Sequence, residues 1–292
     1  MLVHRTGRPR LVVEQILRKM SKIDEVEEQY YLTIKQLQSI FRPNLICSSL
    51  FTIMFQEIWS FLLNPSSLRD NKVKESTRHK FQKLFKVYLF CMASLVVSAV
   101  LIGIVDVILG EFLHYSIAKR IQTNQLEFRT YWAESAWLIT VLLGPVSEEI
   151  VFRLPLSTNK KWFALAISFG VFYFLGDDII DYKSFSLTRI AISILTFLSL
   201  YIFLTEKLFN WLITNGFNLF CWGLIILFSW THIRNFEPIN WSIIYLYPIY
   251  VLPQLFYGIG ASFLMIKYKN LLWPLMLHVL NNGVAALLRS IH

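Results

Sequence analysis

Apolar runs of about 20 residues recur along this chain, and runs of this length can cross a bilayer core of roughly 30 Å. They restrict the fold, because a backbone surrounded by lipid must satisfy its polar groups inside helices or a closed barrel. The composition agrees, since 55% of the 292 residues are hydrophobic and 16% are charged, against about 25% charged in soluble domains. The sequence therefore predicts an all-α, polytopic helical membrane protein with seven to eight membrane segments.

Seven of the expected segments are clear from the sequence. They are residues 86–109, 129–146, 161–177, 187–205, 208–232, 242–266 and 271–289. Another stretch, residues 44–63, contains Gln56 and Glu57 and has basic residues on both sides, which conflicts with the positive-inside rule for a span. It is therefore either a membrane segment held by later helices or an interfacial segment. Tryptophans that match interfacial positions near the segment ends are Trp132, Trp162, Trp211, Trp241 and Trp273.

Residues 1–85 are predicted to form a basic extension that precedes a membrane domain of residues 86–292. Most of the net charge of +9 lies in the extension, and positive charge beside apolar segments is typical of contact with anionic lipid. Apolar residues at helical spacing from Val12 to Met20 fit either an amphipathic helix on the membrane surface or a solvated arm. No helix-turn-helix, zinc-finger or phosphate-loop pattern is present, so we expect no nucleic-acid partner.

Two carboxylates and a guanidinium stand inside one apolar run, the stretch that ends at Arg153. Ionisable groups at membrane depth are costly and persist when they are paired or used. On a helix, Glu149 and Arg153 are four residues apart and share a face, whereas Glu148 points about 100° away. We therefore expect Arg153 to neutralise Glu149, and Glu148 to face a polar cavity as a general base. The alternative is a buried ion pair that only orients helices.

A predicted break in the helix precedes the two acids. Gly144 tolerates unusual backbone angles, and Pro145 cannot donate an amide to the preceding turn. Ser147 is a good capping residue, so the chain is expected to stop at the Gly–Pro pair and restart as a short helix at Ser147. Both acids would then lie at a helix N-terminus, where the helix dipole favours negative charge.

Further polar side chains interrupt two apolar segments downstream. His232 ends an apolar run one turn after Phe228, while His278 and Asn282 are four residues apart on one face of the last expected helix. Histidine and asparagine on one face can donate hydrogen bonds to a developing oxyanion. The alternatives are an interfacial histidine at position 232 and hydrogen bonds between packed helices for the other two. Together with the two acids, these residues predict one buried hydrolytic site.

A divalent metal is not required by this set of residues, and the sequence leaves its presence open. Two histidines and a glutamate form a known catalytic zinc set, so Glu148, His232 and His278 are the ligands to expect if a metal such as zinc binds. No His-Glu-x-x-His pattern is present, and the paired acids already provide a base. An acidic cluster is expected to be a solvated loop, and three separated cysteines are expected to be buried. These residues are Asp177, Asp178 and Asp181, and Cys47, Cys91 and Cys221.

The three motifs, in this order, resemble those of the CPBP family of intramembrane proteases, which comprises CAAX proteases and bacteriocin-processing enzymes and is also called Abi. The family pattern is Glu-Glu-x-x-x-Arg, then Phe-x-x-x-His, then His-x-x-x-Asn. The matching residues are Glu148, Glu149, Arg153, Phe228, His232, His278 and Asn282. The resemblance covers residues 86–289 and leaves the first 85 residues outside.

The resemblance implies an intramembrane endopeptidase that hydrolyses a peptide bond of a membrane-associated peptide or protein. Glu148, helped by His232, would activate the water. His278 and Asn282 would stabilise the oxyanion, and the acid and arginine paired in the first motif would hold the site together. The resemblance also implies an integral membrane protein, expected in the plasma membrane, whose partners are lipid and a substrate at the membrane.

One departure from the family pattern concerns the second motif. The family is expected to place one helix between the first two motifs, but here 74 residues separate Arg153 from Phe228. They leave room for two additional helices, near 187–205 and at the start of 208–232. An even number of extra spans would keep His232 on its original side of the membrane, so the site can survive the insertion.

Two other functions fit parts of the pattern. A non-catalytic membrane scaffold or immunity protein of the same fold would need the polar residues only for packing. A transporter would show internal repeats and paired broken helices, but the sequence has one clear break and no repeat. The deciding feature is whether the site residues converge within about 10 Å of one centre, as a hydrolytic mechanism requires. Those residues are Glu148, His232, His278 and Asn282.

Overall fold

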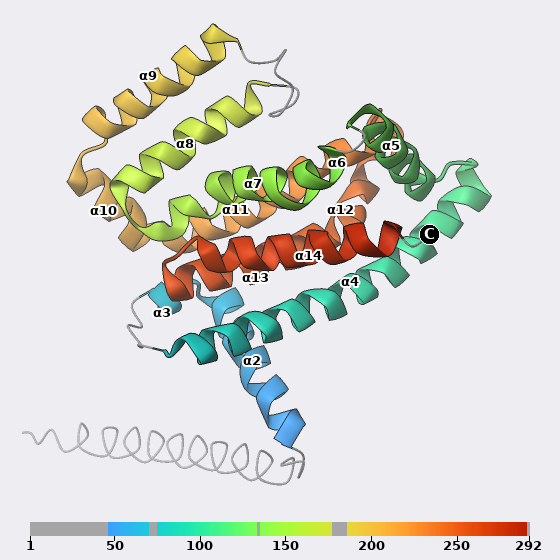
Figure 1. The fold of residues 1–292 in the computed structure, drawn as a ribbon, viewed down its shortest axis with the longest axis horizontal. Helices are drawn as coiled ribbons and strands as arrows, with labels where there is room; N and C mark the ends of the chain where they lie inside the picture. Colours follow the sequence, from blue (N-terminus) through green and yellow to red (C-terminus); the bar gives the residue numbers. More distant parts are fainter. Residues whose placement is uncertain (1–45, 70–74, 133–134, 177–185, 291–292) are drawn as a thin grey trace, which may run out of the picture. The chain divides into compact units, whose positions relative to one another are not determined.

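The structure is a computed structural model, and it describes residues 46–69, 75–132, 135–176 and 186–290 (Figure 1). Every regular element within these ranges is a helix, so the predicted all-α class is confirmed. The chain forms two compact units, Met1–Thr52 and Ile53–His292. The first unit is described only for its helical end, and the second contains the elements that position the site.

Several sequence predictions fall on residues outside the described ranges. They are the amphipathic helix from Val12 to Met20 and the acidic cluster of Asp177, Asp178 and Asp181.

The helices follow one another through short connections. The first are α2 (Ile46–Leu63), α3 (Ser66–Arg69), α4 (Thr77–Leu113), α5 (Ile117–Trp132), α6 (Ser135–Leu138) and the π-helix η1 (Ile139–Leu143). Next come α7 (Gly144–Phe152), the 3-10 turn η2 (Leu154–Ser157), α8 (Lys160–Phe174), α9 (Leu187–Phe203) and α10 (Glu206–Asn215). The last are α11 (Phe217–Thr231), the 3-10 turns η4 (His232–Phe236) and η5 (Trp241–Leu246), α12 (Tyr247–Tyr250), α13 (Leu252–Tyr268) and α14 (Leu272–Ser290).

Helix α13 lies at the centre of the second unit. Its residues from Tyr257 to Ile266 are all buried, as expected for a helix that is apolar on every side. It packs against α4, α11 and α14 (Figure 1). The three motifs lie on or beside these neighbours, so α13 is the helix around which they are assembled.

Two glycines allow α13 to approach its neighbours closely. A Cβ atom at Gly260 would lie 2.9 Å from Val87 Cγ1 and 3.0 Å from Cys91 Sγ, both on α4. A Cβ atom at Gly258 would lie 3.3 Å from the ring of Phe228 on α11. Small residues at such contacts let helix backbones approach one another.

Helices α8, α9 and α10 lie together on one side of the second unit (Figure 1). Helix α8 packs against both α7 and α9, and the chain turns by 93° between α9 and α10. Helices α9 and α10 occupy the place of the two additional helices that were predicted. The prediction of one span over 208–232 is wrong, because α10 ends at Asn215 and α11 begins at Phe217. The Asn215–Gly216 pair ends the helix there, since glycine is a poor helix former.

Two helical stretches among the described residues are long and apolar enough to cross a membrane. They are α4 and the run from Ser135 to Phe152. The number rises to four if each of two bent pairs forms one span, namely α9 with α10 and Trp241–Tyr250 with α13. The predicted span over 129–146 is displaced towards its C-terminal side, because the polar helix α5 runs to Trp132.

The predicted boundary at residue 85 lies inside the second unit. Ile58 of α2 is buried in the main core, and Glu57 forms ion pairs with Lys83 at 2.8 Å and Lys267 at 3.2 Å. These contacts attach the second half of α2 to α4 and α13. The sequence does not reveal this attachment, because Lys267 is 210 residues away from the acid that it pairs with.

The structure bears on several predictions for single side chains. Three of the tryptophans predicted to be interfacial are exposed, namely Trp162, Trp211 and Trp241. Their position at a membrane interface stays a prediction, and the side chain of Trp132 lies outside the described residues. The prediction is wrong for Trp273, which is buried and contacts the rings of Phe81 and Tyr268. Cys91 and Cys221 are buried and free, as predicted.

Replacing Gly260 by alanine is expected to lower the free energy of unfolding by about 1–3 kcal/mol, because the added methyl group overlaps α4. Thermal unfolding of the purified protein in detergent measures this change. Gly103→Ala is the matched control, since nothing lies within 4 Å of its Cβ position. Alanine there is expected to leave the stability unchanged or raise it by up to about 1 kcal/mol. Equal stability of the Gly260 variant and wild type would contradict the close packing of α13 on α4.

Candidate active site

The two acids of the first motif lie on α7, which continues directly from the π-helix η1. The amide of Gly144 bonds to the carbonyl of Ile139, five residues earlier, and Gly144 itself has helical angles of φ −56° and ψ −59°. The prediction that the helix stops at the Gly–Pro pair is therefore wrong, because the helix continues through it. Pro145 has no amide to donate, and a widened turn just before it carries the helix past that gap. Such π-bulges are frequent at functional sites.

The predicted capping role of Ser147 is also wrong. Its hydroxyl lies 3.0 Å from the carbonyl oxygen of Leu143 and 2.8 Å from that of Gly144, so it bonds back into the preceding turn. Serine residues bonded in this way tend to bend helices. Because the helix is continuous through this point, Glu148 and Glu149 do not lie at a free N-terminus, and the helix dipole does not account for their charge.

Glu149 is completely buried and joins three helices. Its Oε1 accepts a hydrogen bond from the hydroxyl of Tyr257 on α13 at 2.9 Å and lies 2.8 Å from Nδ1 of His278 on α14. Its Oε2 lies 3.6 Å from Nε of Arg153, which confirms the predicted contact. A buried carboxylate is stable only when it is paired and hydrogen-bonded, and Glu149 has both kinds of partner.

Arg153 is also buried and is surrounded by aromatic rings. Its Cζ lies 4.0 Å from the centre of the Phe228 ring, 5.8 Å from that of Tyr257 and 5.9 Å from that of Phe152. Within the described part of the chain, none of its guanidinium nitrogens has a hydrogen-bond partner. Its charge is therefore balanced by Glu149 and by cation–π contacts, of which the one with Phe228 is the shortest.

Phe228 also positions the second motif. Its carbonyl oxygen lies 2.8 Å from Nδ1 of His232, one turn later, and the two rings contact each other edge to face at 4.7 Å. Because a carbonyl only accepts hydrogen bonds, Nδ1 of His232 carries a proton and Nε2 points away from the helix. The same argument applies to His278, whose Nδ1 faces the carboxylate of Glu149.

Glu148 meets both histidines at one oxygen atom. Its Oε2 lies 3.8 Å from Nε2 of His232 and 3.7 Å from Nε2 of His278. These separations are too long for direct hydrogen bonds, and Oε2 has no hydrogen-bond partner within the described residues. The group opposite Glu148 is a pair of imidazoles, and Arg153 contacts Glu149 instead. That Glu148 faces a polar cavity stays a prediction.

Asn282 lies one turn beyond His278 but has a different partner. Its Nδ2 donates to the carbonyl oxygen of Thr140 in η1 at 2.9 Å, which ties α14 to the π-helix. The structure thus brings Glu148, His232 and His278 together, whereas the amide of Asn282 is held by the backbone. Its role at an oxyanion stays a prediction.

The predicted metal set coincides with this convergence of side chains. Glu148, His232 and His278 point their acceptor atoms at one another, as zinc ligands do. No group of three histidine, cysteine or acidic side chains in the described ranges, however, has a geometry that could hold a metal ion. The metal alternative stays a prediction.

Sequence reasoning missed two participants, Tyr257 and Thr140. Tyr257 belongs to none of the three motifs, although it contacts Glu149 and its ring lies 4.6 Å from that of His278. Its only sequence signal is a polar hydroxyl beside Gly258 in an apolar segment. Thr140 takes part through its backbone carbonyl, so its side chain gives no signal.

Comparisons of the chain with protein-family models, curated proteins and solved structures found no match. The geometry of the side chains is therefore the basis on which a function is proposed.

Replacing Tyr257 by phenylalanine is expected to lower the free energy of unfolding by about 1–3 kcal/mol, because the buried Glu149 loses a donor. Thermal unfolding in detergent measures the loss. Tyr245→Phe is the matched control, because this tyrosine is 70% exposed, and its change should stay within about 0.5 kcal/mol. If the two variants unfold alike, the Tyr257 hydroxyl does not support Glu149.

Proposed function

We propose that this protein is an intramembrane endopeptidase of the CPBP type, which hydrolyses a peptide bond of a membrane-associated peptide or protein. The observation that supports it best is that Glu148 Oε2 lies near the Nε2 atoms of both His232 and His278, at 3.8 and 3.7 Å. With His232 neutral and His278 protonated on both nitrogens, Glu148 Oε2 and His232 Nε2 are two acceptor atoms at this point, and His278 Nε2 is a donor. A water molecule can donate to two such atoms, which is how a base holds the water that it deprotonates.

In the proposed mechanism, Glu148 takes a proton from a water molecule that His232 orients through Nε2. The hydroxide formed attacks the carbonyl carbon of the scissile peptide bond. His278, protonated on both nitrogens, donates Nε2–H to the oxyanion, and Glu149 stabilises the imidazolium through Nδ1. Glu148 then gives its proton to the leaving amine as the C–N bond breaks, which restores the carboxylate.

Asn282 is proposed as the second oxyanion donor. This role requires its Nδ2 to exchange the carbonyl of Thr140, 2.9 Å away, for the substrate oxygen. Catalytic hydrogen bonds often align only when substrate is bound. Arg153 and Phe228 keep a supporting role, because they hold the charge of Glu149 and the ring of His232.

The proposal places the protein in the membrane with seven to eight segments, as an integral protein of the plasma membrane. Apolar helices that are bent or short, such as α8 with 15 residues, would supply the segments beyond the long ones. Buried charge at Glu149 and Arg153 is typical of functional sites at membrane depth. Lipid and a substrate at the membrane would be the partners.

A non-catalytic membrane scaffold or immunity protein is the second candidate. It is favoured by two observations: Glu148 is too far from either imidazole for a direct hydrogen bond, and Asn282 already bonds to Thr140. In that case the polar network would serve only to fix the helices relative to one another.

The substitution Glu148→Gln separates the two candidates, because it removes the base and keeps the size of the side chain. Loss of a general base is expected to slow hydrolysis by roughly 10²- to 10⁴-fold. Comparative proteomics of membranes from cells with the wild-type or variant protein would show uncleaved substrates accumulating. Glu127→Gln is the matched control, since Glu127 is an exposed acid on α5. The scaffold is favoured if the Glu148 variant folds and its membranes contain the same proteins as wild-type membranes, while the membranes of a strain that lacks the protein differ.

Removal of divalent metal is expected to leave the hydrolysis rate unchanged, because Glu148 supplies the base directly. The measurement is the cleavage of an identified substrate by purified protein before and after treatment with a chelator. Loss of activity that added zinc restores would contradict this expectation and assign Glu148, His232 and His278 as ligands.

A further inference from the structure

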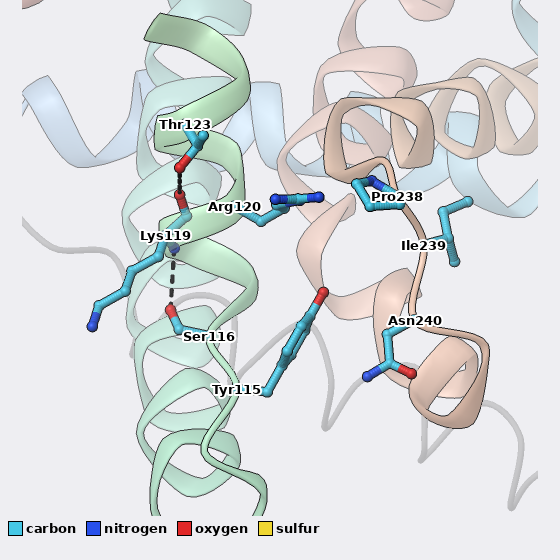
Figure 2. A pocket seen from close by; sticks show the side chains of 8 residues that line it. All are labelled: Tyr115, Ser116, Lys119, Arg120, Thr123, Pro238, Ile239 and Asn240. Carbon is cyan, nitrogen blue, oxygen red and sulfur yellow. Dashed lines mark hydrogen bonds between the residues drawn. The ribbon is translucent and has the colours of Figure 1, made fainter. Parts of the chain in front are cut away.

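A pocket of about 470 Å³ lies between the start of α5 and the turn that follows η4 (Figure 2). Tyr115 and Arg120 line one side, and Pro238 and Asn240 line the other. None of these residues belongs to the three motifs. Figure 2 shows the guanidinium of Arg120 reaching across towards Pro238, whereas the amine of Lys119 points away.

Lys119 and Arg120 are the basic residues that line this pocket, and the guanidinium of Arg120 is the one directed across it. Its Nε donates to the carbonyl oxygen of Glu237 at 3.2 Å, which fixes the plane of the guanidinium. The carboxylate of Glu237 pairs instead with Arg234 at 3.5 Å. Across the described ranges no carboxylate forms an ion pair with Arg120, so its two terminal nitrogens are available to an anion.

The amides at the start of α5 are not available to a ligand. Asp106 on α4 accepts hydrogen bonds from the amides of Ile117 and Ala118 at 2.9 and 3.1 Å. Its other oxygen accepts the hydroxyl of Ser116 at 2.6 Å, and that hydroxyl oxygen accepts the amide of Lys119 at 3.1 Å. The acid therefore caps the helix, and an anion in the pocket would depend on side-chain donors.

Asn240 supplies a second side-chain donor. Its Oδ1 accepts from the amide and the hydroxyl of Ser242 at 3.2 and 2.7 Å. This orientation leaves the NH₂ group free of those contacts, and Figure 2 shows that its nitrogen is on the side facing Tyr115. Arg120 and Asn240 thus present donors from opposite walls.

The pocket lies where a long apolar helix ends. Tyr115 is the second residue after α4, which is the more apolar of the two unbent candidate spans. Two large aromatic side chains close in sequence to the lining residues Tyr115 and Asn240 are exposed, with values of 81% for Phe112 and 75% for Trp241. Exposed aromatic residues at the end of a span are typical of the depth of lipid headgroups.

We propose that this pocket binds a phosphate group, that of an anionic phospholipid headgroup, with Arg120 as the principal contact and Asn240 as the second. A guanidinium with two free nitrogens matches two phosphate oxygens. Basic pockets at the ends of membrane helices bind headgroups in this way. The inference rests on the membrane location in the proposed function and is independent of the hydrolysis.

The test is binding of phosphatidylglycerol to the full-length protein in detergent, measured by native mass spectrometry against phosphatidylcholine. Arg120→Gln is expected to weaken phosphatidylglycerol binding by about fivefold, as for the loss of one cation near a headgroup. Arg129→Gln is the matched control, because it removes an exposed cation from the last turn of the same helix. Its binding should equal that of wild type.

A second measurement covers the case in which the Arg120 variant fails to fold. In the wild-type protein, phosphatidylglycerol should slow amide hydrogen exchange in residues 235–241 and in the first turn of α5, relative to phosphatidylcholine. Glycerol phosphate tests the source of the phosphate. If it binds as tightly and depends on Arg120, the site takes a water-soluble phosphate ester; if it does not bind, the site takes the lipid. Equal weakening by both arginine variants, no weakening by either, or protection elsewhere in the chain would overturn the proposal.

Discussion

The buried carboxylate of Glu149 is the group on which the arrangement of the second unit depends. A charge without solvent is strongly destabilising unless partners surround it, and its partners come from α7, α13 and α14. Tyr257 and His278 donate to one oxygen, and Arg153 lies beside the other. Removing any one of these partners would leave the carboxylate undercompensated, so the three helices must keep their relative positions.

This network also sets the state of the neighbouring groups. Because Glu149 accepts a hydrogen bond from Nδ1 of His278, and the carbonyl of Phe228 accepts one from Nδ1 of His232, both imidazoles direct Nε2 towards Glu148. The order of the two acids therefore has a physical meaning. The deeper carboxylate orients His278, and Glu148, which retains 19% exposure of its side chain, is the one proposed for chemistry.

Much of the fold was predictable from the sequence, because apolar runs of helical length leave few alternatives in lipid. The errors have identifiable causes, some local and one long-range. The continuous helix through Pro145 was missed because a π-turn leaves no signature in the residue types. The role of Ser147 was missed because its hydroxyl donates to a carbonyl of the preceding turn instead of capping the helix. The attachment of Glu57 to Lys267 was missed because long-range ion pairs are decided by packing.

The sequence by itself determined the helical class, the pairing of Glu149 with Arg153 and the identity of the polar residues in apolar segments, because these follow from periodicity and from the cost of buried charge. Only the tertiary structure decided which groups meet. In it, Glu148 lies beside both histidines, and the amide of Asn282 donates to a backbone carbonyl. Tyr257 donates a hydrogen bond to Glu149, which no motif indicated. The physical reason is that contacts between distant helices depend on their packing distance, which the glycines of α13 set and no motif encodes.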